Sequence, residues 1–157
     1  MATSAALERQ ITTTNVEETR TLGRSLAAKA QAGDLVCLWG ELGAGKTQLA
    51  KGFGAGLGIE STINSPSFVL MAEYPGRLRL FHVDLYRLDG AGEALAGGLV
   101  DERQADGVTI VEWPERLESA LPEDRLDVVI DGAGDEPRRI RLRPGGPRHM
   151  RYLAALP

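Results

Sequence analysis

The stretch that decides the fold is Gly40-Glu41-Leu42-Gly43-Ala44-Gly45-Lys46-Thr47, which matches the pattern G-x-x-x-x-G-K-[ST] at every fixed position. Its glycines let the backbone wrap around phosphate oxygens in conformations closed to residues with a β-carbon, and successive amide N–H groups then point into one concavity. The pattern predicts that Lys46 reaches the β- and γ-phosphates and that Thr47 gives its hydroxyl to magnesium. The next residue, Gln48, completes the predicted nucleotide-binding set.

Patterned segments on both sides place this loop in an α/β unit. Leu35–Trp39 is a continuous apolar run, as expected of a strand covered on both faces. Lys46–Leu57 carries Leu49 and Phe53 on one helical stripe. A buried strand, a glycine turn and a helix in this order are the context that a phosphate-binding loop requires. The glycines of Gly52–Gly58 lack the spacing of a dinucleotide-binding loop, so they predict close packing of this helix against its neighbours.

The rest of the chain alternates between strand-like and helix-like segments. We expect a first helix with its N-cap at Thr14, a capping-box partner at Glu17 and a stop at Gly33. The alternation predicts an α/β fold of the P-loop type, a three-layer sandwich with a mixed, partly parallel sheet. The length fits a single domain, residues 1–157, with a basic C-terminal tail at 143–157. Further strands are expected at Gln10–Thr13, Phe68–Tyr74, Leu78–Asp84 (a hairpin with the preceding strand), Val108–Trp113, Leu126–Asp131 and Arg138–Arg143, and helical segments at Ala91–Ala105, Pro114–Leu121 and Arg148–Leu156.

Composition and charge exclude several classes of protein. Apolar residues make up 43% and charged residues 25%, a globular balance, and the net charge of −4 argues against a generic binder of polyanions. The single cysteine, Cys37, excludes an internal disulfide and indicates a reduced, cytoplasmic setting. The N-terminus lacks the basic start and apolar run of a secretion signal, and the aliphatic stretches are too short to span a bilayer. We therefore expect an intracellular protein without membrane contact.

Two carboxylates follow strand-like segments, at positions where open α/β sheets bind their ligands. Glu112 comes directly after Val108–Val111, in which three residues of four are apolar, and Asp84 comes directly after Leu80-Phe81-His82-Val83. A P-loop enzyme needs a carboxylate to complete the magnesium site and a group that orients water. Lys46, Asp84 and Glu112 are therefore the candidate catalytic residues, and Thr47 and Glu112 are the candidate magnesium ligands. For each acid, a solvated carboxylate at a strand end remains the open alternative, as does the choice for Asp84 between metal and water.

Three residues are candidates for a switch or gate at the phosphates. Ser65 and Ser67 follow the P-loop helix, where P-loop proteins carry a segment that senses the γ-phosphate. A proline turn that enters a strand explains these two serines equally well. Trp113 follows Glu112 and fits either a core position or a gate beside the phosphates.

Other polar residues are expected to have structural roles. His82 shares a strand face with Asp84, but a metal needs more ligands than this pair offers, so we expect His82 to be packed or hydrogen-bonded. Cys37 is expected in the core. The C-terminal end is rich in arginine, which usually indicates a solvated edge strand and tail, with contact to RNA or an acidic partner as the alternative. These arginines are Arg138, Arg139, Arg141, Arg143, Arg148 and Arg151.

Four motifs then occur together in one order: Gly40–Thr47, Ser65-Pro66-Ser67-Phe68, His82-Val83-Asp84-Leu85-Tyr86-Arg87 and Val111-Glu112-Trp113-Pro114. Many families share the P-loop, but the combination is specific. By it the chain resembles the TsaE family, also called YjeE, from Thr12 to Arg143. The resemblance implies a P-loop fold with a mixed sheet, binding of ATP or ADP with Mg²⁺, and slow ATP hydrolysis by the isolated protein.

The resemblance also implies a pathway and partners. Members of the family are needed to make threonylcarbamoyladenosine (t6A) in tRNA, together with TsaB and TsaD, and the resemblance implies that ATP hydrolysis resets that complex between cycles. TsaD carries the transfer chemistry, so contact of this chain with tRNA is expected to be indirect. Lys46 and Thr47 match the family's phosphate and magnesium residues, and Trp113 matches a functionally important aromatic. Asp84 and Glu112 match its essential acids, whereas Ser67 departs from the usual threonine and keeps only the hydroxyl.

The main expectation is thus a magnesium-dependent accessory ATPase that partner proteins stimulate. A small-molecule kinase is the alternative, although the short chain shows no obvious lid insertion. A GTPase-like switch would need a guanine-recognition motif, Asn-Lys-x-Asp, that the sequence lacks. A non-enzymatic module that holds ADP also stays open. For adenine contacts, Thr13–Val16 and the arginines near Arg138 are the candidate positions.

Overall fold

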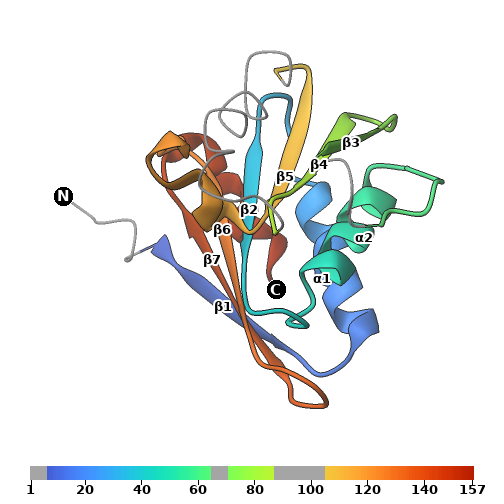
Figure 1. Cartoon of the computed structure of the whole chain (residues 1–157), viewed down its shortest axis with the longest axis vertical. Helices are drawn as coiled ribbons and strands as arrows, with labels where there is room; N and C mark the ends of the chain where they lie inside the picture. The colour runs from blue at the N-terminus through green and yellow to red at the C-terminus, as the bar shows by residue number, and fades with distance from the viewer. Residues whose placement is uncertain (1–6, 65–70, 87–104) are drawn as a thin grey trace.

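Short runs of aliphatic and β-branched residues form the strands of one sheet. They are β1 (Arg9–Thr13), β2 (Leu35–Trp39), β3 (Met71–Tyr74), β4 (Arg79–Asp84), β5 (Gly107–Glu112), β6 (Leu126–Asp131) and β7 (Arg138–Pro144). In this computed structural model, which describes residues 7–64, 71–86 and 105–157, they form a 7-stranded sheet in the order β1-β7-β6-β2-β5-β4-β3 (Figure 1). Strands β6, β2, β5 and β4 are parallel, and antiparallel strands complete both edges. The predicted mixed sheet and the β3–β4 hairpin are confirmed.

Helical elements cover both faces of the sheet. The main ones are α1 (Val16–Ala27) and α2 (Lys46–Gly56), and the 3₁₀ segments are η4 (Pro114–Ala120) and η5 (Pro147–Ala155). The helices α1 and α2 pack against each other over one face, and η5 joins them there (Figure 1). Segment η4 packs on the opposite face through Leu117. The result is the predicted three-layer α/β arrangement.

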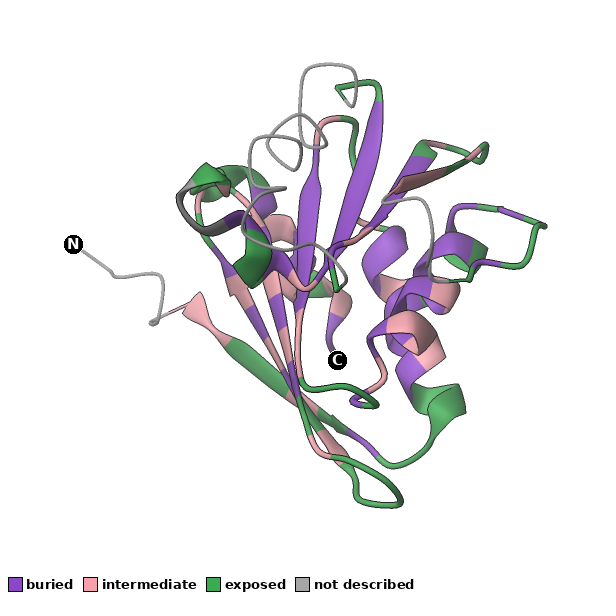
Figure 2. Ribbon diagram, viewed as in Figure 1, coloured by how far each residue is buried: buried purple, intermediate pink, exposed green. Residues whose placement is uncertain are grey.

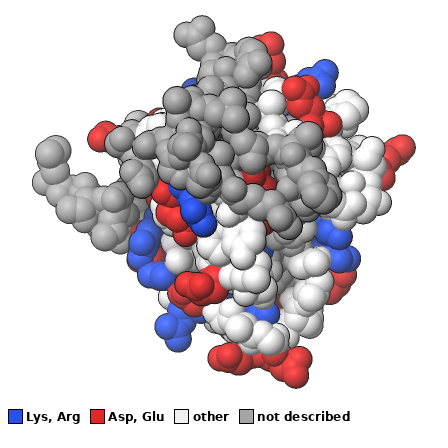
Figure 3. Space-filling model, in the orientation of Figure 1, with Lys and Arg blue, Asp and Glu red and all other residues white. Residues whose placement is uncertain are grey.

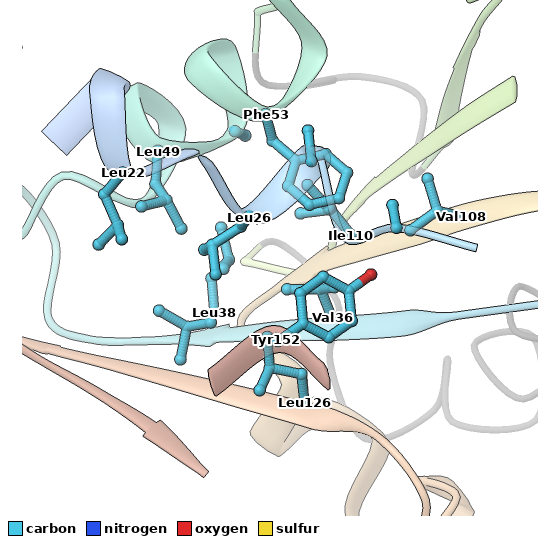
Figure 4. Packing of buried hydrophobic residues seen from close by; sticks show 14 of the residues in the cluster. Leu22, Leu26, Val36, Leu38, Leu49, Phe53, Val108, Ile110, Leu126 and Tyr152 are labelled. Atoms are coloured by element: carbon cyan, nitrogen blue, oxygen red, sulfur yellow. The ribbon is translucent and has the colours of Figure 1, made fainter. Parts of the chain in front are cut away.

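The side chains of β2 alternate between these two layers. Val36 and Leu38 enter the large core under α1 and α2, where Figure 4 shows them below Leu26 and Phe53. Cys37 points to the opposite face, and its burial raises the pKa of its thiol. Each fully buried leucine or phenylalanine contributes about 1.5–3 kcal/mol of hydrophobic free energy. Figure 2 shows β2 and β5 buried along their lengths, so the centre of the sheet is a rigid support for the loops at its ends.

The contact between α1 and α2 depends on glycine. A β-carbon at Gly52 would lie 2.0 Å from the carbonyl oxygen of Arg20, and one at Gly23 would lie 2.3 Å from the carbonyl oxygen of Leu49. Neither distance leaves room for a side chain. The two backbones therefore touch, as the glycines of the helix after the P-loop predicted, and the start of α2 is fixed relative to α1.

The predicted N-cap of α1 was wrong by one residue. The cap is Asn15, whose Oδ1 accepts a hydrogen bond from the Glu18 backbone N–H at 2.8 Å. Glu18, rather than Glu17, completes the reciprocal pair, because its Oε1 accepts from the backbone N–H of Thr14 at 2.6 Å. The hydrogen bonds from the backbone N–H and the hydroxyl of Thr14 to its carboxylate lower the pKa of Glu18. Thr14 and Asn15 are both good capping residues, so the sequence pattern alone did not separate them.

The predicted end of α1 was also wrong. The helix ends at Ala27, and Gly33 instead takes a left-handed conformation (φ 91°) in the turn before β2, where its N–H donates to the carbonyl of Gly107. The other described strand and 3₁₀ boundaries lie close to the predicted ones. Parts of the predicted segments Phe68–Tyr74 and Ala91–Ala105 lie outside the described residues. In the described part of the chain, no helix combines the length and apolar character needed to cross a membrane.

Candidate nucleotide-binding site

The P-loop lies between β2 and α2, at the carboxyl ends of the parallel strands. Gly45 is the N-cap of α2 and has a left-handed backbone (φ 110°) that strains any residue with a side chain. A β-carbon at Gly40 would lie 2.8 Å from the carbonyl oxygen of Ile130 in β6. Glycine at these positions lets the loop pass close to the sheet and turn into the helix. The positive end of α2 therefore faces the hollow of the loop, where an anion binds favourably.

Lys46 is buried and turned back onto this loop, with 5% of its surface exposed. Its Nζ donates to the carbonyl oxygen of Gly40 at 2.6 Å and lies 3.4 Å from the ring centroid of Trp113. Burial lowers the pKa of Lys46 below its ordinary value, and nearby carboxylates, Glu112 first, oppose that shift. The ammonium group is thus held at the loop by one carbonyl and one aromatic face.

Trp113 covers this ammonium from a strained backbone position. Its φ of 61° is left-handed, which costs a residue other than glycine about 1–2 kcal/mol. Its ring also packs against the ring of Tyr86, with centroids 4.9 Å apart. Trp113 is partly buried on the η4 side of the sheet. The structure therefore places Trp113 at Lys46, and its role as a gate stays a prediction.

The two predicted acids lie side by side, because β4 and β5 are parallel and pair Asp84 with Glu112. Glu112 is 3% exposed. Thr47 Oγ1 donates toward both of its carboxylate oxygens, at 3.2 and 3.3 Å, and His82 Nε2 lies 2.6 Å from Oε2. Asp84 Oδ1 accepts from the backbone N–H of Tyr86 at 2.9 Å. The hydroxyl predicted to bind magnesium and one of the predicted acids therefore form a single hydrogen-bonded group.

Oxygen atoms of this group suit magnesium. A hydroxyl and a carboxylate are hard ligands of the kind Mg²⁺ prefers, and this ion is usually held by one or two protein side chains together with phosphates and water. Within residues 7–64, 71–86 and 105–157, no cluster of three or more His, Cys, Asp or Glu side chains could hold a metal without such help. Thr47 and Glu112 thus fit a magnesium ion that arrives with a polyphosphate.

A cavity of about 270 Å³ opens beside the P-loop. In its wall, Arg138 Nε donates to the carbonyl oxygen of Ala44 at 2.8 Å, and Nη2 donates to that of Gly43 at 3.3 Å. Gln48 also lines it, with its Oε1 accepting from Arg20 Nε and Nη2 at 2.9 and 2.7 Å. The cavity joins the start of α1, the start of α2 and the β6–β7 hairpin. Its lining is Thr14, Asn15, Val16, Thr19, Ala44, Gly45, Gln48, Gly134, Asp135, Glu136 and Arg138.

Most arginines of the C-terminal end serve internal contacts. Arg143 pairs with Glu8 at 2.7 Å and Arg141 with Asp131 at 3.0 Å. Arg148 donates to the carbonyl oxygen of residue 32 at 2.6 Å, and Arg151 bonds to Asp34 near the start of β2. Figure 3 shows basic and acidic side chains interspersed on the visible face. These pairings support the structural interpretation of the basic end over a nucleic-acid surface.

The structure thus brings five predicted residues to one edge of the sheet: Lys46, Thr47, Asp84, Glu112 and Trp113. The predicted switch residues Ser65 and Ser67 lie outside the described residues. Sequence reasoning missed two contacts, that of His82 with Glu112 and that of Arg138 with the P-loop. The signal for the first was present, since His82 and Asp84 share a strand face, but the neighbouring strand was not identified from the sequence.

Fold and loop together define an α/β protein of the P-loop type. The family model described as "Threonylcarbamoyl adenosine biosynthesis protein TsaE" matches residues 13–140. The TsaE protein of Bacillus subtilis (strain 168) is 44% identical over 138 residues, covering 87% of this chain and 86% of the relative. That of Streptomyces coelicolor is 43% identical over 136 residues, covering 82% and 92%. The crystal structure of Bacillus subtilis YdiB superposes with a TM-score of 0.78 at 38% identity, covering 94% and 92%. The chain belongs to the TsaE family.

Proposed function

We propose that this chain binds ATP or ADP with Mg²⁺ at the P-loop and hydrolyses ATP slowly, as a cytoplasmic accessory ATPase in the formation of t6A in tRNA. The observation that carries the proposal is the convergence of Lys46, Thr47 and Glu112 on the start of α2. An ammonium, a hydroxyl and a carboxylate are the three groups that a P-loop uses on a magnesium-bearing triphosphate. The TsaE family is one of t6A biosynthesis proteins, and membership supports a role in that pathway.

In this proposal each polar group has one task. The loop amides and the N-terminus of α2 receive the phosphate oxygens, and Lys46 exchanges the Gly40 carbonyl for the β- and γ-phosphates. Magnesium, held by Thr47, Glu112 and the phosphates, neutralises charge on the phosphates when bound. Asp84, which pairs with Glu112 on the neighbouring strand, orients the attacking water or supports the metal. The fold holds these side chains close together, which favours catalysis by positioning.

The cavity beside the P-loop is the site we assign to the base and ribose. It is continuous with the phosphate site through Ala44 and Gly45, and its far walls are formed by Thr14–Val16 and Arg138. Both of these walls coincide with the positions proposed from the sequence for adenine contacts. Adenine is favoured over guanine because the sequence lacks the Asn-Lys-x-Asp motif.

The contacts of two described arginines beside the site support slow turnover by the isolated chain. An arginine that stabilises the transferring phosphate is worth about 10³–10⁵ in kcat in related chemistry. Arg138 is committed to two P-loop carbonyls and Arg20 to Gln48, so neither guanidinium reaches into the loop. We propose that TsaB and TsaD stimulate the activity and that hydrolysis resets their complex, while tRNA contact stays indirect. Leu42 (69% exposed) and Tyr86 (44% exposed) beside the site offer apolar contacts to such partners.

The test measures ATP hydrolysis by the purified chain and its association with purified TsaB and TsaD. The chain is incubated with labelled ATP and Mg²⁺, alone and with TsaB and TsaD, and complex formation is followed by pull-down with and without ATP. We expect slow release of free phosphate, stimulation by the partners, and association that depends on ATP. Glu112→Ala should lose the stimulated rate. Phosphorylated small molecules in place of free phosphate would indicate a kinase, and an unchanged Glu112→Ala rate would indicate a module that only holds nucleotide.

A further inference from the structure

His82 is a fully buried polar residue in the middle of β4, with none of its surface exposed. Its Nε2 lies 2.6 Å from Oε2 of Glu112, the carboxylate assigned to magnesium. We propose that His82 is a positioning residue, which fixes the orientation of the Glu112 carboxylate and thereby sets the affinity of the site for magnesium. This inference rests on the proposed function and names a residue of this chain that acts through Glu112 rather than on the nucleotide.

The pairing of β4 with β5 makes the contact possible. The two strands are parallel, with His82 opposite Ile110 and Asp84 opposite Glu112. His82 and Glu112 are therefore diagonal neighbours on the same face, within reach of long or aromatic side chains. The imidazole approaches the carboxylate from the sheet side, and Thr47 approaches it from the start of α2. The glutamate is held between the sheet and the P-loop helix.

The chemistry of the two side chains defines which one donates the hydrogen bond. An ionised carboxylate only accepts hydrogen bonds, so Nε2 carries the hydrogen and donates it to Oε2. In the proposed complex Thr47 turns its hydroxyl oxygen to magnesium, and the imidazole remains as the side chain that holds Glu112. A glutamate without such a partner loses orientation, because its side-chain torsions are free to change. Partners that orient metal ligands are worth 10–100-fold in metal affinity or activity in other sites.

Packing alone does not explain a histidine at this position. The neighbouring residues Leu80 and Val83 are buried and apolar, and an apolar side chain at 82 would avoid burying two ring nitrogens. Within the described residues, Nδ1 of His82 has no hydrogen-bond partner. A buried polar atom without a partner lowers stability, so the residue is better explained by the contact that Nε2 makes.

The test uses three substitutions of the full-length chain. His82→Leu removes the donor. His82→Gln places an amide nitrogen at the reach of Nε2, whereas His82→Asn places it at the reach of Nδ1, too short for Glu112. For each variant, ATP affinity is titrated against Mg²⁺ and ADP affinity is measured without metal. We expect His82→Leu and His82→Asn to raise the half-saturating Mg²⁺ concentration by about 10–100-fold. His82→Gln should restore it to within about threefold of wild type, and metal-free ADP affinity should stay unchanged in all three.

Val83→Ala is the matched control, since Val83 is equally buried on the same strand but faces the opposite side. It should lower the midpoint of thermal unfolding without changing the Mg²⁺ titration. Equal Mg²⁺ titrations for wild type and His82→Leu would overturn the inference, as would equal behaviour of the Asn and Gln variants or a parallel loss of metal-free ADP binding. A wild-type chain whose ATP affinity ignores Mg²⁺ would overturn the proposed function itself, and the inference with it.

Discussion

Strand β2 lies between Asp34, the residue before its first residue, and the P-loop, and a cluster of buried polar side chains lies at each of its ends. At the first end, Asp34 Oδ2 accepts from the Tyr152 hydroxyl at 2.6 Å, from the backbone N–H of Gln31 at 2.9 Å and from Arg151. His149 Nε2 accepts from the backbone N–H of residue 35 at 3.0 Å, and its Nδ1 bonds to Asp124 at 2.7 Å. This cluster ties segment η5 to the sheet.

The cluster at the P-loop end is built differently. Lys46 bonds a carbonyl and a ring face rather than a paired carboxylate, and Trp113 has a strained backbone. In the described residues each cluster leaves one buried polar atom without a hydrogen bond, namely His82 Nδ1 here and Asp34 Oδ1 at the other end, but Asp34 Oδ1 still lies 3.4 Å from the Arg148 guanidinium. On the function proposed above, the polar groups at the P-loop end are held for a ligand, whereas at the Asp34 end they are mainly bonded to one another. On that proposal, the carboxyl ends of the parallel strands serve binding and their amino ends serve stability.

Removing Asp34 should give the largest effect and act on stability alone. Asp34→Ala leaves Arg151 and Tyr152 without their shared acceptor, and we expect a loss of about 3 kcal/mol in the free energy of unfolding. Urea denaturation measures it. Nucleotide affinity, measured at a temperature where the variant is folded, should not change. Asp124→Ala, at the half-exposed partner of His149, should cost only about 1 kcal/mol. A fall in nucleotide affinity with Asp34→Ala would break the division between the two ends.

Lys46→Ala should weaken nucleotide binding and leave stability nearly unchanged. Loss of the ammonium is expected to weaken ATP and ADP binding by about 100-fold, since a hydrogen bond to a charged group contributes about 1.5–3 kcal/mol. The unfolding free energy should change by less than about 1 kcal/mol, because burial of the ammonium already opposes its hydrogen bond. Calorimetric titration and urea denaturation measure the two quantities. Lys51→Ala, on the same helix but lining a different hollow, is the control and should leave binding intact.

Arg138→Ala should have a smaller effect on binding. The guanidinium donates to the carbonyls of Gly43 and Ala44, so its loss frees the outer side of the P-loop. We expect nucleotide affinity to fall about fivefold, or about 1 kcal/mol. Arg141→Ala, which removes an exposed ion pair with Asp131, should leave affinity unchanged. If Arg138→Ala and Arg141→Ala lowered nucleotide affinity equally, the loss would come from the change in net charge and not from the lost contact with the P-loop.

Alkaline pH should lower the free energy of unfolding through Tyr152, whose hydroxyl bonds to Asp34. Burial, followed by the hydrogen bond to Asp34, raises the pKa of Tyr152 above its ordinary value. The unfolded chain therefore releases this proton first, so the stabilisation is complete below about pH 10 and is lost progressively as the pH rises above it. At about pH 10.5 the loss from this group is about 0.8 kcal/mol. Tyr152→Phe should show a shallower decline than wild type in urea denaturation across this range, and parallel declines would contradict the assignment.

Much of the fold could be predicted because its determinants are local. The P-loop, the apolar run of β2 and the stripe on α2 each depend on residues close in sequence. The contact of His82 with Glu112 could not be predicted, since it depends on β4 and β5 being neighbours. The partners of Arg141 and Arg143 were missed for the same reason, because sequence shows a charge but not what lies across the sheet from it.

The contact of Gly23 and Gly52 with the opposite backbone has a mechanical consequence. Because the backbones of α1 and α2 touch without intervening side chains, we expect the two helices to move as one unit. Asn15 caps the start of α1 and Lys46 is the first residue of α2. The β-carbon of an alanine at position 52 would clash with the backbone of α1 and push the two helices apart. It would change the spacing between the α1 side and the α2 side of the proposed nucleotide cavity, although residue 52 does not line that cavity.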